Sequence, residues 1–430
     1  MRIAVCNRFG RLVGGVESYL ARLIPALANE GHELALLFET DTSAALPELT
    51  TKDRSWFASE IGIPQLLHRL RRWRPDIIYI HGFSDAVLAG GLIETAPVVL
   101  FAHDYAATCI SGAKRFAFPR IRSCSRRLGA GCLLNYLPRR CGGLSPITMW
   151  QEYRNRFILL DLTHHFQFIL VASEAMRREY LRHAVEPDRM EVVPYPVLAI
   201  AEEPGGDTTA DMTRLSRLQS TRFGPVHLLF AGRMVQLKGG EVLIRALREI
   251  VQILERPLKL TFAGDGPAKP EWEAQAQRVC AQNRFVSVEF TGWLGHANLQ
   301  KVISQCDLLV VPSLWPEPFG MIGLEAGTAG LPTVAFALGG IPEWLHDGVN
   351  GFLASADPPY VPALAAAIAK CLADPALYQR LCTGARQQAA QFGMKRHVQK
   401  LQQIFARAID GTIVRCGPGI GKQQARESGN

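Results

Sequence analysis

The sequence has no long apolar run. No segment approaches the ~20 consecutive apolar residues that cross a bilayer, and the opening residues, MRIAVCNRFG, lack the apolar core of a signal peptide. We therefore expect a cytoplasmic protein, either free or peripheral on the inner face of the membrane. With 430 residues, the chain is too long for one hydrophobic core of ordinary size, so more than one domain is expected.

Acidic residues are missing from one segment, 105–148. The whole chain has 47 lysines and arginines against 39 acidic residues, and this segment alone has eight basic residues and no aspartate or glutamate. The excess positive charge of the protein is therefore one local feature. The basic residues are Lys114, Arg115, Arg120, Arg122, Arg126, Arg127, Arg139 and Arg140.

Three interpretations of this basic segment are open. It is a plain solvated surface, or a nucleic-acid patch, or a surface for the phosphates of an anionic membrane or a lipid-diphosphate acceptor. No nucleic-acid-binding fold accompanies it, so we predict no nucleic-acid partner. We favour the acceptor or membrane surface, with Arg120, Arg122, Arg126 and Arg127 as its contacts.

Cysteines are too dilute for a disulfide scaffold, at ten in 430 residues. Four of them nevertheless lie within the basic segment, and no C-x2-C pair is present among them. A structural zinc ion, a disulfide and free thiols are the alternatives, and we favour free thiols. The four are Cys109, Cys124, Cys132 and Cys141.

No G-x-G-x-x-G follows the first expected strand, which disfavours a dinucleotide oxidoreductase. Short apolar runs instead alternate with helical stretches in both halves of the chain, and this alternation predicts an α/β protein of doubly wound parallel sheets. Ligands of such sheets bind at the carboxyl ends of the strands. The expected strands include Arg2–Cys6, Glu33–Phe38, Asp76–Gly82, Pro97–His103, Val226–Gly232, Leu258–Gly266 and Asp307–Pro312.

A polar stretch interrupted by glycine and proline divides the two sets of strands. We expect two Rossmann-like domains with the ligand cleft between them and a final helix before a disordered tail. The predicted ranges are 1–198 for the first domain, with 105–148 as its insert, 199–225 for a linker, 226–392 for the second domain, 393–410 for the final helix and 411–430 for the tail.

The stretch Pro312–Gly330, PSLWPEPFGMIGLEAGTAG, follows an apolar strand and continues into an expected helix over Phe319–Ala329. Glu317 then lies just before the helix and Glu325 about two turns along it. Because a helix N-terminus attracts anions, a phosphate can bind at Phe319–Gly320 while the carboxylates take hydroxyl groups. Two glutamates around a diphosphate suggest a sugar nucleotide. The alternative is one glutamate that favours the helix dipole and one surface glutamate.

Other candidate residues follow strand ends. AGRMVQLKGG contains Arg233 and Lys238, two cations suited to a diphosphate, or alternatively solvated loop cations. AGDGP, with Gly264 and Asp265, forms a turn that a nucleotide can approach, although this sequence also suits an ordinary turn. His103, before Asp104, is a candidate for sugar positioning or proton transfer, or is merely structural.

Taken in order, GGVE, HD, GR-x4-KG, AGDGP, EPFGMIGLE and GGIPE resemble the retaining GT-B glycosyltransferases of family 4. The resemblance covers about residues 1–410 and both domains. It implies a sugar nucleotide held mainly by the second domain, an acceptor held mainly by the first, and a final helix that crosses back onto the first domain. The long insert after His103 departs from the family pattern.

The resemblance also implies roles for single residues. Arg233 and Lys238 are expected to hold the diphosphate, Glu325 the ribose, and Glu317 the donor sugar together with the backbone of Phe319 and Gly320. The remaining expected contacts are Gly14 and Gly15 with the diphosphate, and His103 with the transferred sugar.

The predicted function is metal-independent sugar transfer, with retention, from a nucleotide-diphosphate sugar to a glycan or lipid-linked acceptor of a bacterial-type cell-surface polysaccharide or lipopolysaccharide. The sugar nucleotide is a co-substrate, and no cofactor is expected. The alternatives are a GT-B sugar-nucleotide epimerase and a catalytically silent binding subunit.

Overall fold

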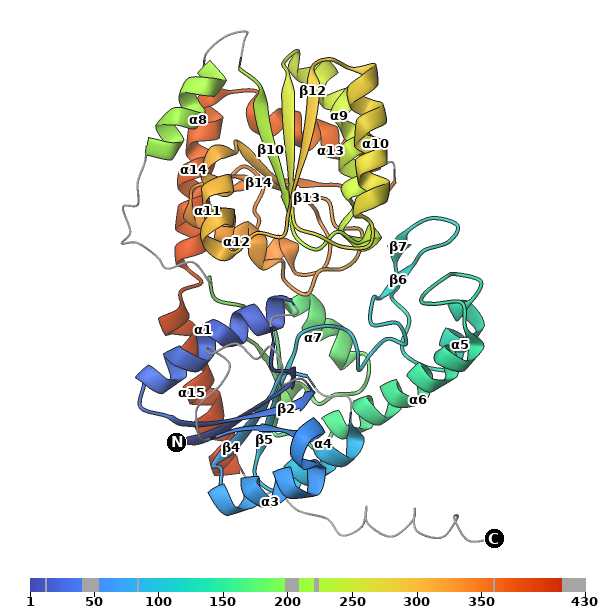
Figure 1. Cartoon of the computed structure of the whole chain (residues 1–430), viewed down its shortest axis with the longest axis vertical. Coiled ribbons are helices and arrows are strands. Elements are labelled where there is room, and N and C mark those ends of the chain that lie inside the picture. The colour runs from blue at the N-terminus through green and yellow to red at the C-terminus, as the bar shows by residue number, and fades with distance from the viewer. Residues whose placement is uncertain are drawn as a thin grey trace.

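The computed structural model describes residues 1–11, 14–40, 54–82, 85–197, 209–219, 224–358 and 360–411. Two α/β domains lie one above the other, and the last helix returns from the second domain to the first (Figure 1). Both sheets are parallel throughout, which confirms the predicted fold class.

The first domain contains a seven-stranded sheet. Its strands are β1 (Arg2–Phe9), β2 (Glu33–Thr40), β3 (Ser55–Phe57), β4 (Ile77–Ile80), β5 (Val98–Ala102), β8 (Phe168–Val171) and β9 (Met190–Val192). They run in the order β3-β2-β1-β4-β5-β8-β9. All residues of β4, β5 and β8 are buried, as expected for central parallel strands covered on both faces. The helices between them are α1 (Gly15–Asn29), α2 (Ala58–Ile61), α3 (Ile63–Trp73), α4 (Ala86–Ile93) and α7 (Glu174–Leu181).

The second domain contains a six-stranded sheet. Its strands are β10 (Val226–Ala231), β11 (Leu258–Ala263), β12 (Val286–Gly292), β13 (Leu308–Val311), β14 (Thr333–Phe336) and β15 (Gly351–Ala354). They run in the order β12-β11-β10-β13-β14-β15, so the strand order reverses between β10 and β13. The carboxyl ends of these two strands therefore form the expected ligand-binding edge. The helices are α9 (Gly240–Leu254), α10 (Lys269–Gln282), α11 (His296–Gln305), α12 (Met321–Thr328), α13 (Tyr360–Leu372) and α14 (Pro375–Ala390).

The final helix, α15 (Met394–Asp410), packs on α1, β4 and β5 of the first domain. Five apolar residues on one face are buried there: Val398, Leu401, Ile404, Phe405 and Ala408. The chain leaves the first domain at Val197 and returns to it after Phe392. The backbone N–H of Val197 donates to the carbonyl of Phe392 at 2.7 Å, and this hydrogen bond joins the two segments that connect the domains. The final helix therefore crosses from the second domain back onto the first.

The range predicted as a linker contains a helix, α8 (Thr209–Gln219), which packs on α11 and α14. Its Arg214 is fully buried and donates to the carbonyls of Ile303, Cys306 and Ala329 at 2.8 to 3.0 Å. This part of the range is therefore docked on the second domain. Residues 198–208 and 220–223 of the same region, and 412–430 of the predicted tail, lie outside the described residues.

The insert after β5 forms a lobe at the side of the molecule (Figure 1). It contains the antiparallel pair β6 (Arg115–Phe116) and β7 (Arg122–Ser123), then α5 (Ala130–Tyr136) and α6 (Pro146–Thr163), which extends beyond the insert. Lys114 and Glu179 of α7 are both buried and form an ion pair at 2.5 Å, which ties the lobe to the first domain. Lys114 is therefore unavailable to an external partner.

Cys109, Cys124, Cys132 and Cys141 are free thiols. Among the described residues no group of three or more histidine, cysteine or acidic side chains is arranged to hold a metal ion. The zinc interpretation thus gains no geometric support. Among all the residues that the structure describes, no single helix is long and apolar enough to cross a bilayer. The bent pair of helices Tyr360–Leu372 and Pro375–Asp410 qualifies by length and composition alone.

Candidate functional site

The stretch after β13 adopts the predicted strand, turn and helix, but the helix starts at Met321 and not at Phe319. Gly320 precedes it with φ of 93°, a left-handed conformation that favours glycine. Phe319 is buried, and its carbonyl accepts a hydrogen bond from Nε1 of Trp344 at 2.6 Å. Phe319 and Gly320 therefore form the turn before the helix and not its first residues.

Glu317 is buried in this turn and meets the predicted cation Lys238. Its Oε1 accepts hydrogen bonds from Nζ of Lys238 at 2.6 Å and from Oγ of Ser313 at 2.5 Å. Both bonds go to Oε1, so Oε2 can accept a further hydrogen bond. Nζ of Lys238 also lies 5.8 Å from the ring centroid of Trp315. Two predicted residues, one from each side of the strand-order reversal, thus form one charged pair.

Ser313, Trp315 and Tyr105 were not singled out from the sequence. Tyr105 is buried with its ring centroid 6.3 Å from that of Trp315. Burial raises the pKa of Tyr105, and the charges of Glu179, Glu317 and Glu343 add to this effect. Tyr105 therefore places the start of the insert beside Glu317, a contact that no local pattern indicates.

Arg233 is exposed in the loop after β10. The neighbouring AGDGP loop packs on this loop backbone to backbone, because the N–H of Met234 donates to the carbonyl of Asp265 at 2.8 Å. A Cβ on Gly264 would lie 2.1 Å from the carbonyl oxygen of Gly232. The close contact between the two loops therefore explains by itself why position 264 is a glycine. The same contact holds Arg233 and Asp265 at one edge of the sheet.

Glu325 lies in α12, half-buried, and burial raises its pKa to about 7. The positive charge of Arg22, in α1 of the first domain, lowers that pKa to a smaller extent. Glu325 therefore lies where the two domains face each other, and a fraction of its carboxyl groups is protonated near neutral pH.

The first-domain loop also reaches this edge. The N–H of Gly14 donates to Oε2 of Glu17 at 2.9 Å, which caps α1. A Cβ on Gly15 would lie 3.0 Å from Cε of Met321, the first residue of α12. The structure thus brings the predicted Gly14–Gly15 turn against the predicted anion-binding end of α12.

His103 is engaged within the first domain. Its Nε2 lies 2.9 Å from Nδ1 of His81, and its Nδ1 is hydrogen-bonded to the hydroxyl of Tyr195. Burial lowers the pKa of His103 to about 3, so the ring is neutral at pH 7. Proton transfer by an imidazolium is therefore disfavoured, and a contact with a sugar requires one of these two partners to be displaced.

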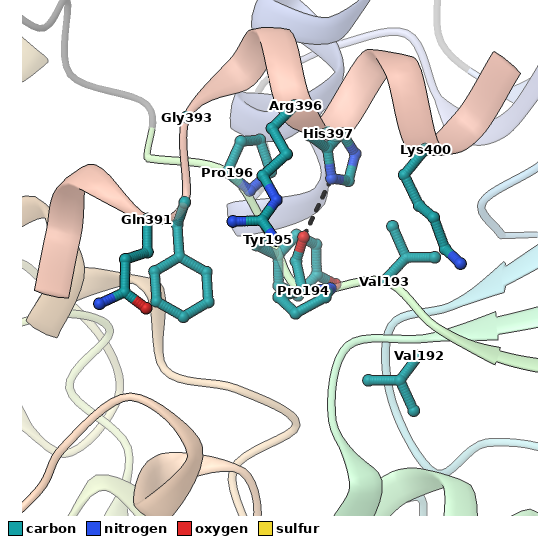
Figure 2. A pocket seen from close by; sticks show the side chains of 11 residues that line it. Val192, Val193, Pro194, Tyr195, Pro196, Gln391, Gly393, Arg396, His397 and Lys400 are labelled. Carbon is teal, nitrogen blue, oxygen red and sulfur yellow. Dashed lines mark hydrogen bonds between the residues drawn. The ribbon is translucent and has the colours of Figure 1, made fainter. Parts of the chain in front are cut away.

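A cavity of about 410 Å³ lies where the chain passes between the domains, and neither Glu317 nor Glu325 lines it. Figure 2 shows that it is enclosed by the chain crossing at Val192–Pro196 and by Arg396, His397 and Lys400 of α15. Nδ1 of His397 donates to the carbonyl of Pro194 at 2.9 Å, so Nε2 accepts from the hydroxyl of Tyr19 at 2.7 Å. This cavity marks the joint between the domains.

The predicted acceptor or membrane contacts Arg120, Arg122, Arg126 and Arg127 are exposed on the lobe. The lobe also contacts the second domain, because the hydroxyl of Tyr360 donates to the carbonyl of Ile121 at 2.6 Å. These arginines therefore lie on a structure that borders both domains.

Two family profiles match the chain. The profile described as Glycosyltransferase Family 4 matches residues 13–197, and that of Glycosyl transferases group 1 matches residues 225–374. Between them they cover more than half of the chain and both domains.

Curated relatives match mainly in parts. Glycogen synthase from Mycobacterium tuberculosis is 38% identical over 169 residues, which are 39% of this chain and 38% of that protein. The first of these relatives is thus matched over well under two thirds of its length. The 2-deoxystreptamine glucosyltransferase of Streptomyces kanamyceticus is 26% identical over 375 residues, 82% of this chain and 84% of that protein.

Solved structures match nearly the whole chain. HepE from Anabaena, crystallised with UDP-glucose, has a TM-score of 0.65 at 19% identity and covers 95% of this chain and 100% of its own. Sucrose-phosphate synthase from Thermosynechococcus elongatus has a TM-score of 0.67 at 19% identity and covers 96% of this chain and 100% of its own. At these identities the likeness establishes the fold.

Proposed function

The chain belongs to the group 1 glycosyl transferases and has the GT-B fold, and from this premise we propose that it transfers a sugar from a nucleotide-diphosphate sugar to an acceptor. The observation that carries the proposal is the contact between Lys238 and Glu317 at the strand-order reversal of the second sheet. A buried carboxylate and a partly exposed ammonium group meet there at the ligand-binding edge of the fold.

The donor's diphosphate binds between the Arg233–Lys238 loop and the start of α12. Arg233 is exposed and free to turn toward a phosphate, and the N–H groups at the start of α12 attract an anion. Gly15 lets the first-domain loop approach from the opposite side. Solved structures of the same fold support a nucleotide-linked donor, because HepE was crystallised with UDP and with UDP-glucose, and the pneumococcal O-GlcNAc transferase GtfA with UDP and GlcNAc.

The two glutamates have separate roles in this proposal. Oε2 of Glu317 accepts a hydrogen bond from the donor sugar, since Lys238 and Ser313 hold Oε1. Glu325 accepts hydrogen bonds from the ribose hydroxyls, and it does so best when ionised. His103 contacts the transferred sugar only after it releases His81 or Tyr195.

Transfer proceeds with retention and without a catalytic metal. The cations Arg233 and Lys238 stabilise the charge that develops on the departing diphosphate, which is the work a metal ion does in other transferases. The leaving diphosphate assists deprotonation of the acceptor hydroxyl on the same face of the sugar. The acceptor is a glycan or lipid-linked glycan of a cell-surface polysaccharide, and the cytoplasmic location expected from the sequence stays a prediction.

The test is incubation of the purified protein with labelled UDP-, GDP-, ADP- or dTDP-sugars and extracted bacterial glycolipid. We expect a labelled product of higher mass whose new linkage has the donor's anomeric configuration by NMR. Excess EDTA should leave the rate unchanged. Isomerisation of the donor without transfer would identify an epimerase instead, and loss of activity with EDTA would contradict the metal-independent mechanism.

A further inference from the structure

The lobe of the first domain exposes large apolar side chains. Eight of the fourteen exposed large apolar residues in the described part of the chain lie between positions 118 and 158. Leu134 is 78% exposed, Ile147 71% and Trp150 53%. Single exposed apolar residues are ordinary, but a concentration of them marks an interaction surface.

Helix α6 is apolar on two neighbouring faces. Met149, Tyr153 and Leu160 pack against the small core of the lobe. Ile147, Trp150, Phe157 and Ile158 are exposed. They form a second row with the exposed Arg154, in which Trp150 lies three positions after Ile147 and four before Arg154, and Phe157 and Ile158 lie three and four positions after Arg154. A surface helix with one buried face normally has a polar outer face. The apolar outer face of α6 therefore indicates a binding surface.

The same lobe has a basic surface. Arg120, Arg122, Arg126, Arg127 and Arg140 are exposed, and the segment 105–148 has no acidic residue. At the tip of the β6–β7 connection the guanidinium of Arg140 lies 5.4 Å from the ring centroid of Phe118, which is half exposed. Basic and apolar side chains are therefore both exposed on this lobe, and at Arg140 and Phe118 they lie in contact.

The combination of exposed arginines and exposed apolar side chains limits the kind of partner that this lobe can bind. A second copy of the chain would oppose the arginines of segment 105–148 to one another, and that segment has no acidic residue to pair with them. A nucleic acid offers no apolar layer to Ile147 and Trp150. An anionic bilayer offers both chemistries, because phosphates lie directly above the acyl boundary in which aromatic and aliphatic side chains of interfacial helices settle.

We propose that this lobe docks the protein on an anionic phospholipid bilayer. The side chains of Ile147 and Trp150 enter the boundary between headgroups and acyl chains, and the exposed arginines contact the lipid phosphates. The lobe starts directly after β5 and touches the second domain through Ile121, so the bilayer lies beside the joint between the domains. Docking itself does not depend on the proposed reaction.

The test is co-sedimentation with vesicles of phosphatidylethanolamine and phosphatidylglycerol, without donor or acceptor. We compare the wild type with the double variant Ile147→Ser, Trp150→Ser and with a variant in which Arg120, Arg122, Arg126 and Arg127 are all changed to Gln. Matched controls on the second domain are Ile253→Ser with Phe285→Ser, and Arg245, Arg248, Arg278 and Arg284 all changed to Gln; all of these residues are exposed.

We expect the wild type to sediment with these vesicles at low salt but not with phosphatidylcholine vesicles. Each basic residue near an anionic surface strengthens partitioning by roughly fivefold, so the four-arginine variant should lose binding by a hundredfold or more. The Ile147 and Trp150 double variant should lose at least about tenfold at the same salt, and both controls should bind as the wild type does.

Brominated lipids provide a second readout, because they should quench Trp fluorescence in the wild type and quench it less in the double variant. Melting curves in buffer confirm that each variant is folded. Failure of the wild type to bind, or equal loss in the matched controls, overturns the proposal. Self-association that the double variant abolishes also overturns it, in favour of a second copy. Because no sugar nucleotide is present, none of these outcomes bears on the transfer reaction.

Discussion

Lys238 and Arg233 belong to one loop but differ in their surroundings. Lys238 is paired with the buried Glu317, whereas Arg233 is exposed. Their replacement should therefore separate stability from activity.

We predict that Arg233→Ala and Lys238→Ala each lower kcat/KM by tenfold to a hundredfold, about 1.5–3 kcal/mol of transition-state stabilisation. Lys238→Ala should also reduce the free energy of unfolding by about 1–2 kcal/mol, because it leaves the carboxylate of Glu317 with Ser313 alone. Arg233→Ala should unfold as the wild type does. Steady-state kinetics and urea unfolding check both parts, and wild-type transfer by both variants would remove the diphosphate role.

Glu325 gives a pH dependence with a defined sign. Its folded pKa of about 7 is above the ordinary 4.5, so the folded state holds a proton that the unfolded chain releases between these values. Stability therefore falls as pH rises from 4.5 to 7. Glu325→Gln should be more stable than the wild type by on the order of 1–2 kcal/mol at pH 8 and equal to it at pH 4. Urea unfolding at both pH values measures the difference.

The same carboxyl should control donor binding. If the ionised form accepts the ribose hydroxyls, the donor KM of the wild type falls as pH rises through 7, and the KM of Glu325→Gln is higher and flat. A parallel pH dependence of KM in the variant would mean that another group is responsible.

Single residues also show how much of the site can be predicted from the sequence. That Lys238 pairs with Glu317 is visible only in the structure, but each residue follows the end of one of two neighbouring strands, so both positions could be named in advance. The partners of His103 could not, because His81 and Tyr195 come from separate strand ends that only the folded sheet brings together. For Gly264, the sequence indicated a glycine turn, but the opposing backbone that requires glycine is visible only in the fold.

At the scale of elements, α15 joins the domains through His397. Burial lowers the pKa of this histidine from 6.5 to about 4, so the unfolded chain gains a proton first as pH falls and the wild type loses stability between these values. His397→Ala also removes the imidazole partner of the carbonyl of Pro194 and of the hydroxyl of Tyr19, which then has only the hydroxyl of Tyr79 at 3.4 Å.

We predict that His397→Ala lowers the free energy of unfolding at pH 7 by about 2–4 kcal/mol. The variant should lose less stability than the wild type between pH 6.5 and 4, since one buried imidazole is gone. Lys395→Ala, an exposed neighbour on α15, is the control and should be neutral. Equal stability of His397→Ala and Lys395→Ala would show that the imidazole contacts do not secure the helix.

Strongly apolar strands could be predicted from the sequence, but polar segments that pack on a domain could not. The fully buried strands β4, β5 and β13 stand out because parallel strands covered on both faces are continuous apolar runs. Helix α8 lies in a stretch whose composition indicates a linker, and it is held by the buried Arg214, whose acceptors are carbonyls about 90 or more positions away in the chain. The lobe similarly depends on Lys114 pairing with Glu179.

At the scale of the whole molecule, the two sheets, the returning helix α15 and the lobe determine where a donor and an acceptor can meet. The start of α1 faces the start of α12, and the lobe borders both domains. A donor held at the second sheet is then accessible to an acceptor that approaches from the lobe side. Motif order along the chain predicted the two domains, but the position of the lobe against the second domain came only from the structure.

The central claim is that the second domain binds a nucleotide-diphosphate sugar through the Arg233–Lys238 loop, and a thermal-shift titration tests it most directly. A ligand that binds only the folded protein stabilises it by mass action, about 2.7 kcal/mol at a hundred times Kd. We predict that sugars linked to one of UDP, GDP, ADP or dTDP raise the melting temperature of the wild type and of the four-arginine lobe variant, and raise that of Arg233→Ala far less. No rise with any of these donors, or an undiminished rise in Arg233→Ala, would contradict the account.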